Sequence, residues 1–210
     1  MDELGYKWEV SIESDMLSRM NVLPNNIIRI SKTAHFNDTD IEGLIAHEVK
    51  GHIARRYYAQ QTGLYLFLHG LKGGNIYDEG LAIWNSLNLV NNPKPNVMMN
   101  IALKYIVGYN KYRMDFCELF DYIKSIDVKN QIPETVLFKC IARGKREIYD
   151  TSILGGMRDD SRYLEGYELV NQMSNSERDD ILKWNIGPEQ IRDLPKIKEF
   201  FKLNKFESLV

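Results

Sequence analysis

The sequence predicts a mostly helical α+β fold with a short N-terminal sheet and a helical C-terminal lobe. Two short apolar segments near the start have the spacing of strands, whereas most later apolar residues recur at helical spacing. A few short strands followed by many helices are typical of the α+β class. The chain has 210 residues, of which 44% are hydrophobic, and this length suffices to bury one core. We therefore expect a single domain spanning residues 1–210.

The strand candidates lie within the first thirty residues. Apolar residues alternate with polar ones at Trp8, Val10 and Ile12. A second apolar run at 27–30 follows the turn-forming segment 24–26. These two segments are the expected sheet.

A long helix is predicted from Thr39 to about Gly63. Thr39 and Glu42 have the spacing of a capping box, and apolar residues then recur at helical intervals. A second helix is expected over 78–90, because the asparagines and prolines of 91–95 cannot continue it, and we expect a lobe boundary near 91–95. Further helices are predicted over 97–109, 114–126, 133–142, 161–173, 177–184 and 188–201.

Composition excludes several classes of partner. The 27 basic and 29 acidic residues are interspersed and leave a formal charge of -2, so no basic field for nucleic acid or anionic lipid stands out. No stretch reaches the roughly 18 apolar residues of a membrane span. Cys117 and Cys140 are far apart and lack a metal-type spacing, which fits a reduced intracellular protein. We expect a cytoplasmic protein without nucleic-acid or membrane partners.

The segment from His47 to His52 indicates a metal site. His47-Glu48 followed by His52 resembles, with one extra residue, the His-Glu-x-x-His signature of zinc peptidases. On an ideal α-helix, residues five apart project about 140° away from each other, so the two imidazoles could not share an ion. A π-bulge or a distortion near Gly51 would bring them onto one face. The spacing therefore predicts a break in the i to i+4 ladder between the two histidines.

A catalytic zinc ion takes three protein ligands, so a third ligand should come from another segment. Glu79 is our candidate, because it opens the second predicted helix and the adjacent Gly80 would let that helix lie close to the first. Asp78 is the rival ligand, but it is also the better helix cap. Glu48, between the histidines, then remains as the general base that takes a proton from the attacking water.

The residues around the motif also allow interpretations other than a catalytic site. Arg55 and Arg56, which follow the motif, are expected on a solvated helix face rather than at a substrate. The alternative from a different class is a non-catalytic interaction protein whose residues bind zinc structurally or bind nothing. A structural zinc site would be closed by a fourth protein ligand, whereas a catalytic one keeps a position open.

These motifs resemble the proteins named for a Gln-Glu-Gly-Leu-Ala motif, which include the microtubule-associated tyrosine carboxypeptidases. The family carries His-Glu-x-x-x-His and, further along, Glu-Gly-Leu-Ala, and both elements are present here. A third block is similar to Arg-Gly, a glycine, and Asp-x-x-Tyr-Leu-x-Gly. The matching residues are His47-Glu48 with His52, Glu79-Gly80-Leu81-Ala82, Arg143-Gly144, Gly155-Gly156, and Asp160 with Tyr163-Leu164 and Gly166.

The resemblance implies a zincin-like zinc carboxypeptidase core in which His47, His52 and Glu79 hold zinc and Glu48 is the catalytic base. It also offers Arg143 and Tyr163 as residues near a peptide or protein substrate, with Tyr163 or Arg143 as donor to the oxyanion. Ordinary core packing is the alternative for Tyr163. Asp159 stands where the family has a lysine, and Arg158 would replace that lysine in binding a C-terminal carboxylate. A zinc endopeptidase with the same metal residues remains the alternative activity.

Overall fold

A computed structural model describes residues 7–16, 19–23, 25–91, 93, 96–129, 131–146, 148–156, 160–187 and 190–203. The side chains at 65, 69 and 201–203 are outside this description. The chain divides into two compact units. The first comprises Met1–Lys94 and Leu169–Val210, and the second comprises Pro95–Glu168. Each unit is described by itself.

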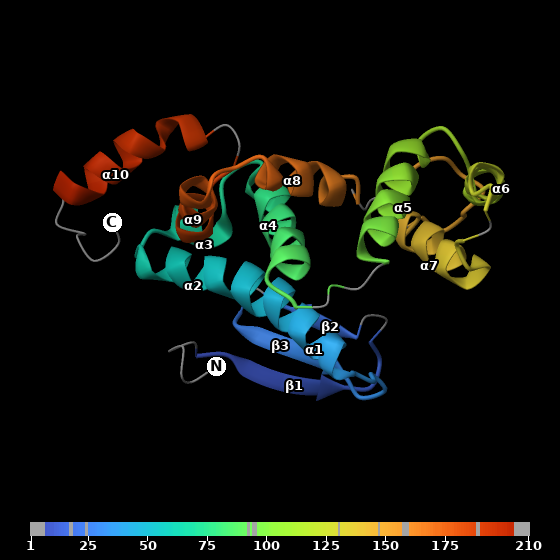
Figure 1. Ribbon diagram of the computed structural model, residues 1–210, viewed down its shortest axis with the longest axis horizontal. Coiled ribbons are helices and arrows are strands. Elements are labelled where there is room, and N and C mark those ends of the chain that lie inside the picture. Colours follow the sequence, from blue (N-terminus) through green and yellow to red (C-terminus); the bar gives the residue numbers. More distant parts are fainter. Residues whose placement is uncertain are drawn as a thin grey trace. The chain divides into compact units, whose positions relative to one another are not determined.

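The first unit contains a three-stranded sheet with the order β1-β3-β2 (Figure 1). β1 (Glu9–Glu13) and β3 (Ile27–Ser31) are the two expected strands, and they pair in parallel with Ile12 opposite Ile30. β2 (Met20–Val22) pairs with β3 in the antiparallel sense. It was not predicted, because three residues are too few to show an alternating pattern. The expected small N-terminal sheet is thus confirmed, with one more strand.

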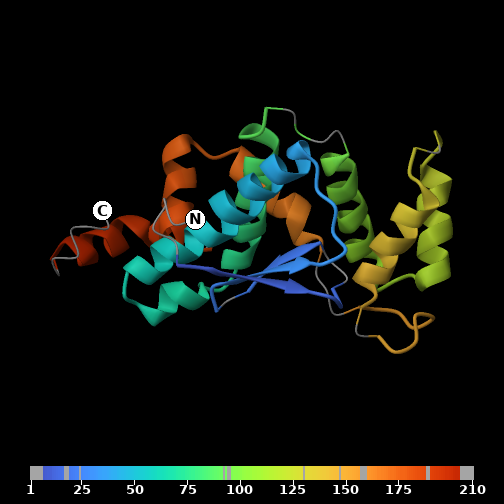
Figure 2. The same cartoon turned by 90° about the horizontal axis from the view of Figure 1, so that it is seen from below.

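A continuous helical rod follows the sheet. It consists of α1 (Asp38–Leu44), a π-helix labelled η2 (Ile45–Ile53) and α2 (Ala54–Gln61). Figure 2 shows these three segments as one rod beside the strands. Asn37, not Thr39, caps α1, and its capping-box partner is Asp40 instead of Glu42. The predicted cap was wrong by two residues because both candidate pairs have the same spacing and polar chemistry.

The rod packs on the sheet through apolar side chains. Ile53 and Ala54 are buried and form one cluster with Ile28 of β3. Val49 and Trp8 are partly buried against the same cluster. Val49 and Ile53 of η2 thus pack toward the sheet, whereas Gly51 of the same segment packs against Ala82 of α4.

The helix that carries Glu79 starts earlier than predicted. α4 spans Gly74–Asn88, and the residue before it, Gly73, has a φ of 80°, a left-handed conformation that glycine adopts without strain. Asp78 therefore lies in the second turn of α4 and does not cap it, so the predicted role of Asp78 as a helix cap is wrong.

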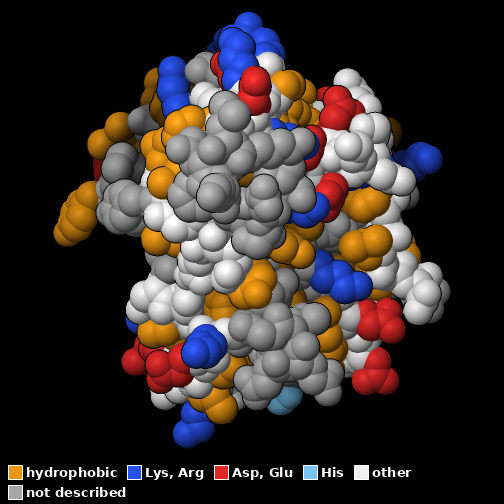
Figure 3. All heavy atoms as spheres, turned by 90° about the vertical axis from the view of Figure 1, so that its left-hand side faces the viewer, with side chains coloured by type: hydrophobic (Ala, Val, Ile, Leu, Met, Phe, Trp, Pro, Cys, Tyr) orange, Lys and Arg blue, Asp and Glu red, His pale blue; other side chains and the backbone are white. Residues whose placement is uncertain are grey.

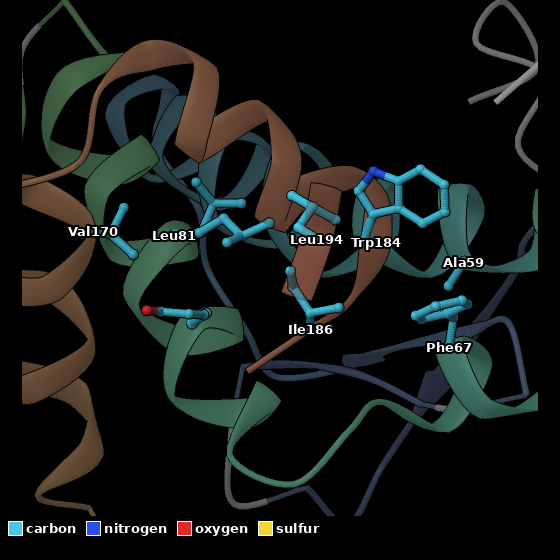
Figure 4. Packing of buried hydrophobic residues seen from close by; sticks show 9 residues of the cluster. Ala59, Phe67, Leu81, Val170, Trp184, Ile186 and Leu194 are labelled. Carbon is cyan, nitrogen blue, oxygen red and sulfur yellow. The ribbon is translucent and has the colours of Figure 1, made fainter. Parts of the chain in front are cut away.

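The main core of the first unit joins segments far apart in the sequence (Figure 4). Phe67 and Trp184 meet edge to face with ring centroids 5.8 Å apart, which is a favourable aromatic geometry. Leu81 of α4 and Leu194 belong to the same buried cluster. The other helical segments of this unit are α3 (Tyr65–His69), α9 (Asn175–Trp184), the 3-10 turn η3 (Ile191–Asp193) and α10 (Leu194–Leu203).

The second unit is helical, with α5 (Val97–Asn110), α6 (Phe116–Ile126), α7 (Glu134–Gly144) and most of α8 (Arg162–Asn171). Its core includes Leu103, Leu119 and Leu137. Glycines of the predicted third block are required for close packing. A Cβ on Gly144 would lie 2.4 Å from Val107, and a Cβ on Gly156 would lie 2.2 Å from the carbonyl oxygen of Gly144.

The two units together are mostly helical beside a small N-terminal sheet, which confirms the α+β class. Within the part of the chain that is described, no helix has the length and apolar character to cross a membrane. On the face shown in Figure 3, acidic and basic side chains are interspersed among the described residues. This agrees with the mixed charge of the sequence.

Candidate metal centre

The π-helix brings the two motif histidines together. In a π-helix the N–H of residue i+5 bonds to the carbonyl of residue i, so residues five apart become neighbours on one face. His47 and His52 have this spacing, and their ring centroids are 5.2 Å apart. The predicted break in the i to i+4 ladder is confirmed. It extends over the nine residues of η2 and is not limited to a single bulge.

Close packing of η2 on α4 brings Glu79 to the histidines. Gly51 is buried at this contact, and a Cβ added to it would lie 2.9 Å from the Cβ of Ala82 and 3.0 Å from its Cα. No other residue type fits there without a shift. The lack of a side chain at Gly51 thus allows η2 and α4 to approach each other closely.

His47, His52 and Glu79 form a group that could hold a metal ion, because ligand atoms from all three lie within 4.8 Å of one another. The Nε2 atoms of His47 and His52 are 4.0 Å and 3.8 Å from Oε2 of Glu79. Both distances exceed a hydrogen bond, and this buried oxygen has no hydrogen-bond partner. A buried oxygen without a partner is costly, and a cation bound between these three atoms would satisfy it. Two imidazoles and a carboxylate are ligands that zinc accepts.

The remaining ring nitrogens are held by α4. Nδ1 of His47 is 3.3 Å from Oγ of Ser86, whose hydroxyl donates to the carbonyl of Ala82 at 2.9 Å. Because that hydroxyl proton is used, the oxygen accepts from Nδ1–H of His47. Nδ1 of His52 donates to Oδ2 of Asp78 at 2.7 Å. Both contacts leave Nε2 as the ring nitrogen that faces Glu79, and this is the nitrogen that would bind an ion in place of a proton.

Asp78 therefore contacts a histidine from outside the three-residue group and does not belong to that group. Its second oxygen pairs with Arg55, at 3.5 Å from Nη1. Arg55 is fully buried, so its expected place on a solvated helix face is wrong. Arg56 is partly buried, and its Nη1 is a buried atom without a hydrogen-bond partner.

The site contains strongly interacting charges. Burial would lower the pKa of His52, but the charge and hydrogen bond of Asp78 outweigh it and raise that pKa to about 9. Burial would raise the pKa of Asp78, yet the charge and hydrogen bond of His52, followed by the charge of Arg55, hold it below its usual range. Burial raises the pKa of Glu48, with the charges of Glu79 and Asp78 adding to this and that of His52 opposing it. Glu48 thus interacts electrostatically with the charges of His52, Glu79 and Asp78.

The substrate-side candidates lie in the second unit. Arg143 donates through Nε to Oδ2 of Asp160 and through Nη2 to the hydroxyl of Tyr163, both at 2.9 Å. Asp160 and Tyr163 are buried, whereas a quarter of the Arg143 side chain is exposed. Lys104 lies over the Tyr163 ring, with Nζ 3.8 Å from the centroid.

Two other basic residues, Lys145 and Arg158, lie near the third block in the sequence. Lys145 is buried, and its ammonium donates to the carbonyls of Lys111, Met114 and Ile153, so it stabilises the fold at this point. Arg158 lies outside the described residues.

A comparison with protein families gives one match that decides the relationship. The family model described as microtubule-associated tyrosine carboxypeptidase matches residues 2–205, which is nearly the whole chain. The chain belongs to this family. The resemblance seen in the sequence motifs is thereby confirmed, and a carboxypeptidase-like peptidase is the activity that the family implies. A comparison with curated proteins finds no match.

The motifs do not reveal the residues that orient the candidate ligands, which are Ser86, Asp78 and Arg55. Ser86 lies seven residues, or about two helical turns, after Glu79 and so on the same face of the helix. This spacing is the feature of the sequence that indicates it. The sequence offers Asp78 as a ligand or a helix cap, whereas in the structure it accepts a hydrogen bond from His52. Arg55 carried no signal, because a charged residue next to a motif is usually solvated.

Proposed function

We propose that this protein is a zinc-dependent metallopeptidase with a zincin-like core that removes a C-terminal residue from a peptide or protein. His47, His52 and Glu79 would hold the ion. The observation that carries the proposal is the buried Oε2 of Glu79 on α4, which has no hydrogen-bond partner and faces the Nε2 atoms of His47 and His52 on η2. When bound, zinc supplies a Lewis acid and lowers the pKa of a water molecule toward neutrality.

Glu48 is the proposed general base. Burial raises the pKa of its carboxyl group, and a raised carboxylate pKa is closer to the pH at which a base both takes and returns a proton efficiently. In the proposed reaction Glu48 accepts a proton from the attacking water and delivers it to the leaving amine. Glu48 is not among the residues grouped as candidate ligands, so it is available for this transfer.

Arg143 and Tyr163 are the proposed substrate residues, together with Arg158. Arg143 donates a hydrogen bond to the hydroxyl oxygen of Tyr163 at 2.9 Å, which orients the phenol, and a tyrosine hydroxyl is a group that can donate to an oxyanion. The side chain of Arg143 is a quarter exposed, and a guanidinium is the group that binds a terminal carboxylate by charge-assisted hydrogen bonds. The family description supports removal of a C-terminal tyrosine from a microtubule protein, which we include as the first substrate class to test.

The test combines metal content with a mass-resolved peptide assay. Purified protein should contain about one zinc ion and should remove single residues from the free C-terminus of a peptide that ends in tyrosine. The same peptide with an amidated terminus should resist cleavage. Internal cleavage of the amidated peptide at the same rate would favour an endopeptidase. Bound zinc without any cleavage, and with a fourth protein ligand, would favour a non-catalytic interaction protein.

A further inference from the structure

Arg55 is a fully buried cation that the proposed reaction does not use. Its Nη1 donates to the carbonyl of Gly74 at 3.1 Å, and its Nη2 donates to the carbonyl of Ile186 at 3.2 Å. The same Nη1 pairs with Oδ1 of Asp78. A charge is buried only where such partners offset its loss of hydration. Gly74 and Asp78 are one turn apart on α4, so Arg55 holds the beginning of this helix at two points.

Asp78 connects this cation to the metal group. One carboxylate oxygen faces Arg55, and the other accepts a 2.7 Å hydrogen bond from Nδ1 of His52. A carboxylate only accepts hydrogen bonds, so the proton of His52 must be on Nδ1. The nitrogen left to bind an ion is Nε2, which is the atom 3.8 Å from Oε2 of Glu79.

We propose that Arg55 and Asp78 are positioning residues of the metal centre, in which Arg55 orients Asp78 and Asp78 orients His52 with Nε2 toward the ion. The inference rests on the proposed function, because it assumes that the three-residue group binds metal. Carboxylate partners of metal-binding histidines change metal affinity by about 10- to 100-fold.

The first test measures zinc affinity of the full chain by competition with a chromophoric chelator. Asp78→Asn keeps the shape of the side chain but removes its charge, and it should weaken zinc binding by about 10- to 100-fold. Asp38→Asn is the matched control. Asp38 is exposed in the first turn of α1, and the variant should bind zinc as the unchanged protein does. Equal affinity of Asp78→Asn and the unchanged protein would overturn this inference alone. Absence of zinc binding by the unchanged protein would overturn the proposed function with it.

Two further measurements do not depend on the behaviour of the Asp78 variant. Arg55→Lys keeps the charge but lacks the forked geometry that reaches three acceptors, so it should also weaken zinc binding. Unchanged affinity would remove Arg55 from the proposal. In the unchanged, zinc-loaded protein, nitrogen NMR shifts should show His52 protonated at Nδ1 and bound through Nε2. The reverse assignment would overturn the role of Asp78.

Discussion

Gly51→Ala probes the packing that brings the proposed ligands together. The new Cβ would lie 2.9 Å from the Cβ of Ala82, whereas ordinary contacts begin near 3.4 Å, so η2 and α4 must separate by about 0.5 Å. Overpacking of this kind costs about 1–3 kcal/mol. Alanine recovers up to about 1 kcal/mol of helix propensity over glycine. We expect a net loss of about 0–2 kcal/mol in the free energy of unfolding.

The same displacement should also reduce zinc affinity. Functional groups must be held within about 0.5 Å of their working geometry, so a shift of this size is at the limit of what the site tolerates. We expect zinc affinity to fall about tenfold, which corresponds to about 1.4 kcal/mol. Urea denaturation of the metal-free protein measures the first quantity, and chelator competition measures the second.

Gly43 provides a matched control for this experiment. It lies in α1 of the same rod, and a Cβ there would meet nothing within 4 Å. Gly43→Ala should be neutral or stabilising by up to about 1 kcal/mol, with unchanged zinc affinity. Adding Ala82→Gly to Gly51→Ala should restore part of the loss in affinity, because it removes the Cβ at 2.9 Å but leaves the Cα of residue 82 at 3.0 Å. If Gly51→Ala matched Gly43→Ala in both measurements, the close approach would not position the site.

Three other changes test separate parts of the structure. Glu48→Gln should keep its zinc, measured by elemental analysis, while turnover falls about 10²- to 10⁴-fold; an active variant would refute the role as base. Glu79→Ala should lose most of its zinc under dialysis, and full occupancy would show that another residue is the third ligand. Lys145→Met removes the ammonium that donates to the carbonyls of Lys111, Met114 and Ile153 and should lower the free energy of unfolding by about 1–3 kcal/mol, whereas an unchanged urea midpoint would contradict that role.

The motif spacing was sufficient to predict the local backbone of the metal centre. His47 and His52 are five residues apart, and the geometry of an α-helix excludes a shared ion at that spacing. A departure from the α-helix between the histidines, as a π-bulge or a distortion near Gly51, was therefore predictable from the sequence. Its length was not, because the nine-residue extent of η2 depends on the sheet packed on one side and α4 on the other.

Other features could not be predicted because they depend on contacts between distant segments. The start of α4 lies four residues before Asp78, at a glycine pair whose neighbours include Asn185 and Ile186. Burial of Arg55 likewise depends on the carbonyl of Ile186. Asn185 and Ile186 are far from the motif in the sequence and leave no pattern near it. The local sequence therefore predicts a helix cap at Asp78 and a solvated Arg55.

The contact between Arg55 and Ile186 has a consequence for synthesis of the protein. These residues are separated by 131 positions, so the guanidinium lacks one of its acceptors until the segment around Ile186 has been translated. Chains are made from the N-terminus at about 5–20 residues per second, and the helix that carries both histidines therefore emerges well before the segment that completes its surroundings. On this order of events, the surroundings of the proposed metal centre are completed only when the segment around Ile186 has emerged, and a shorter nascent chain carries the motif without them.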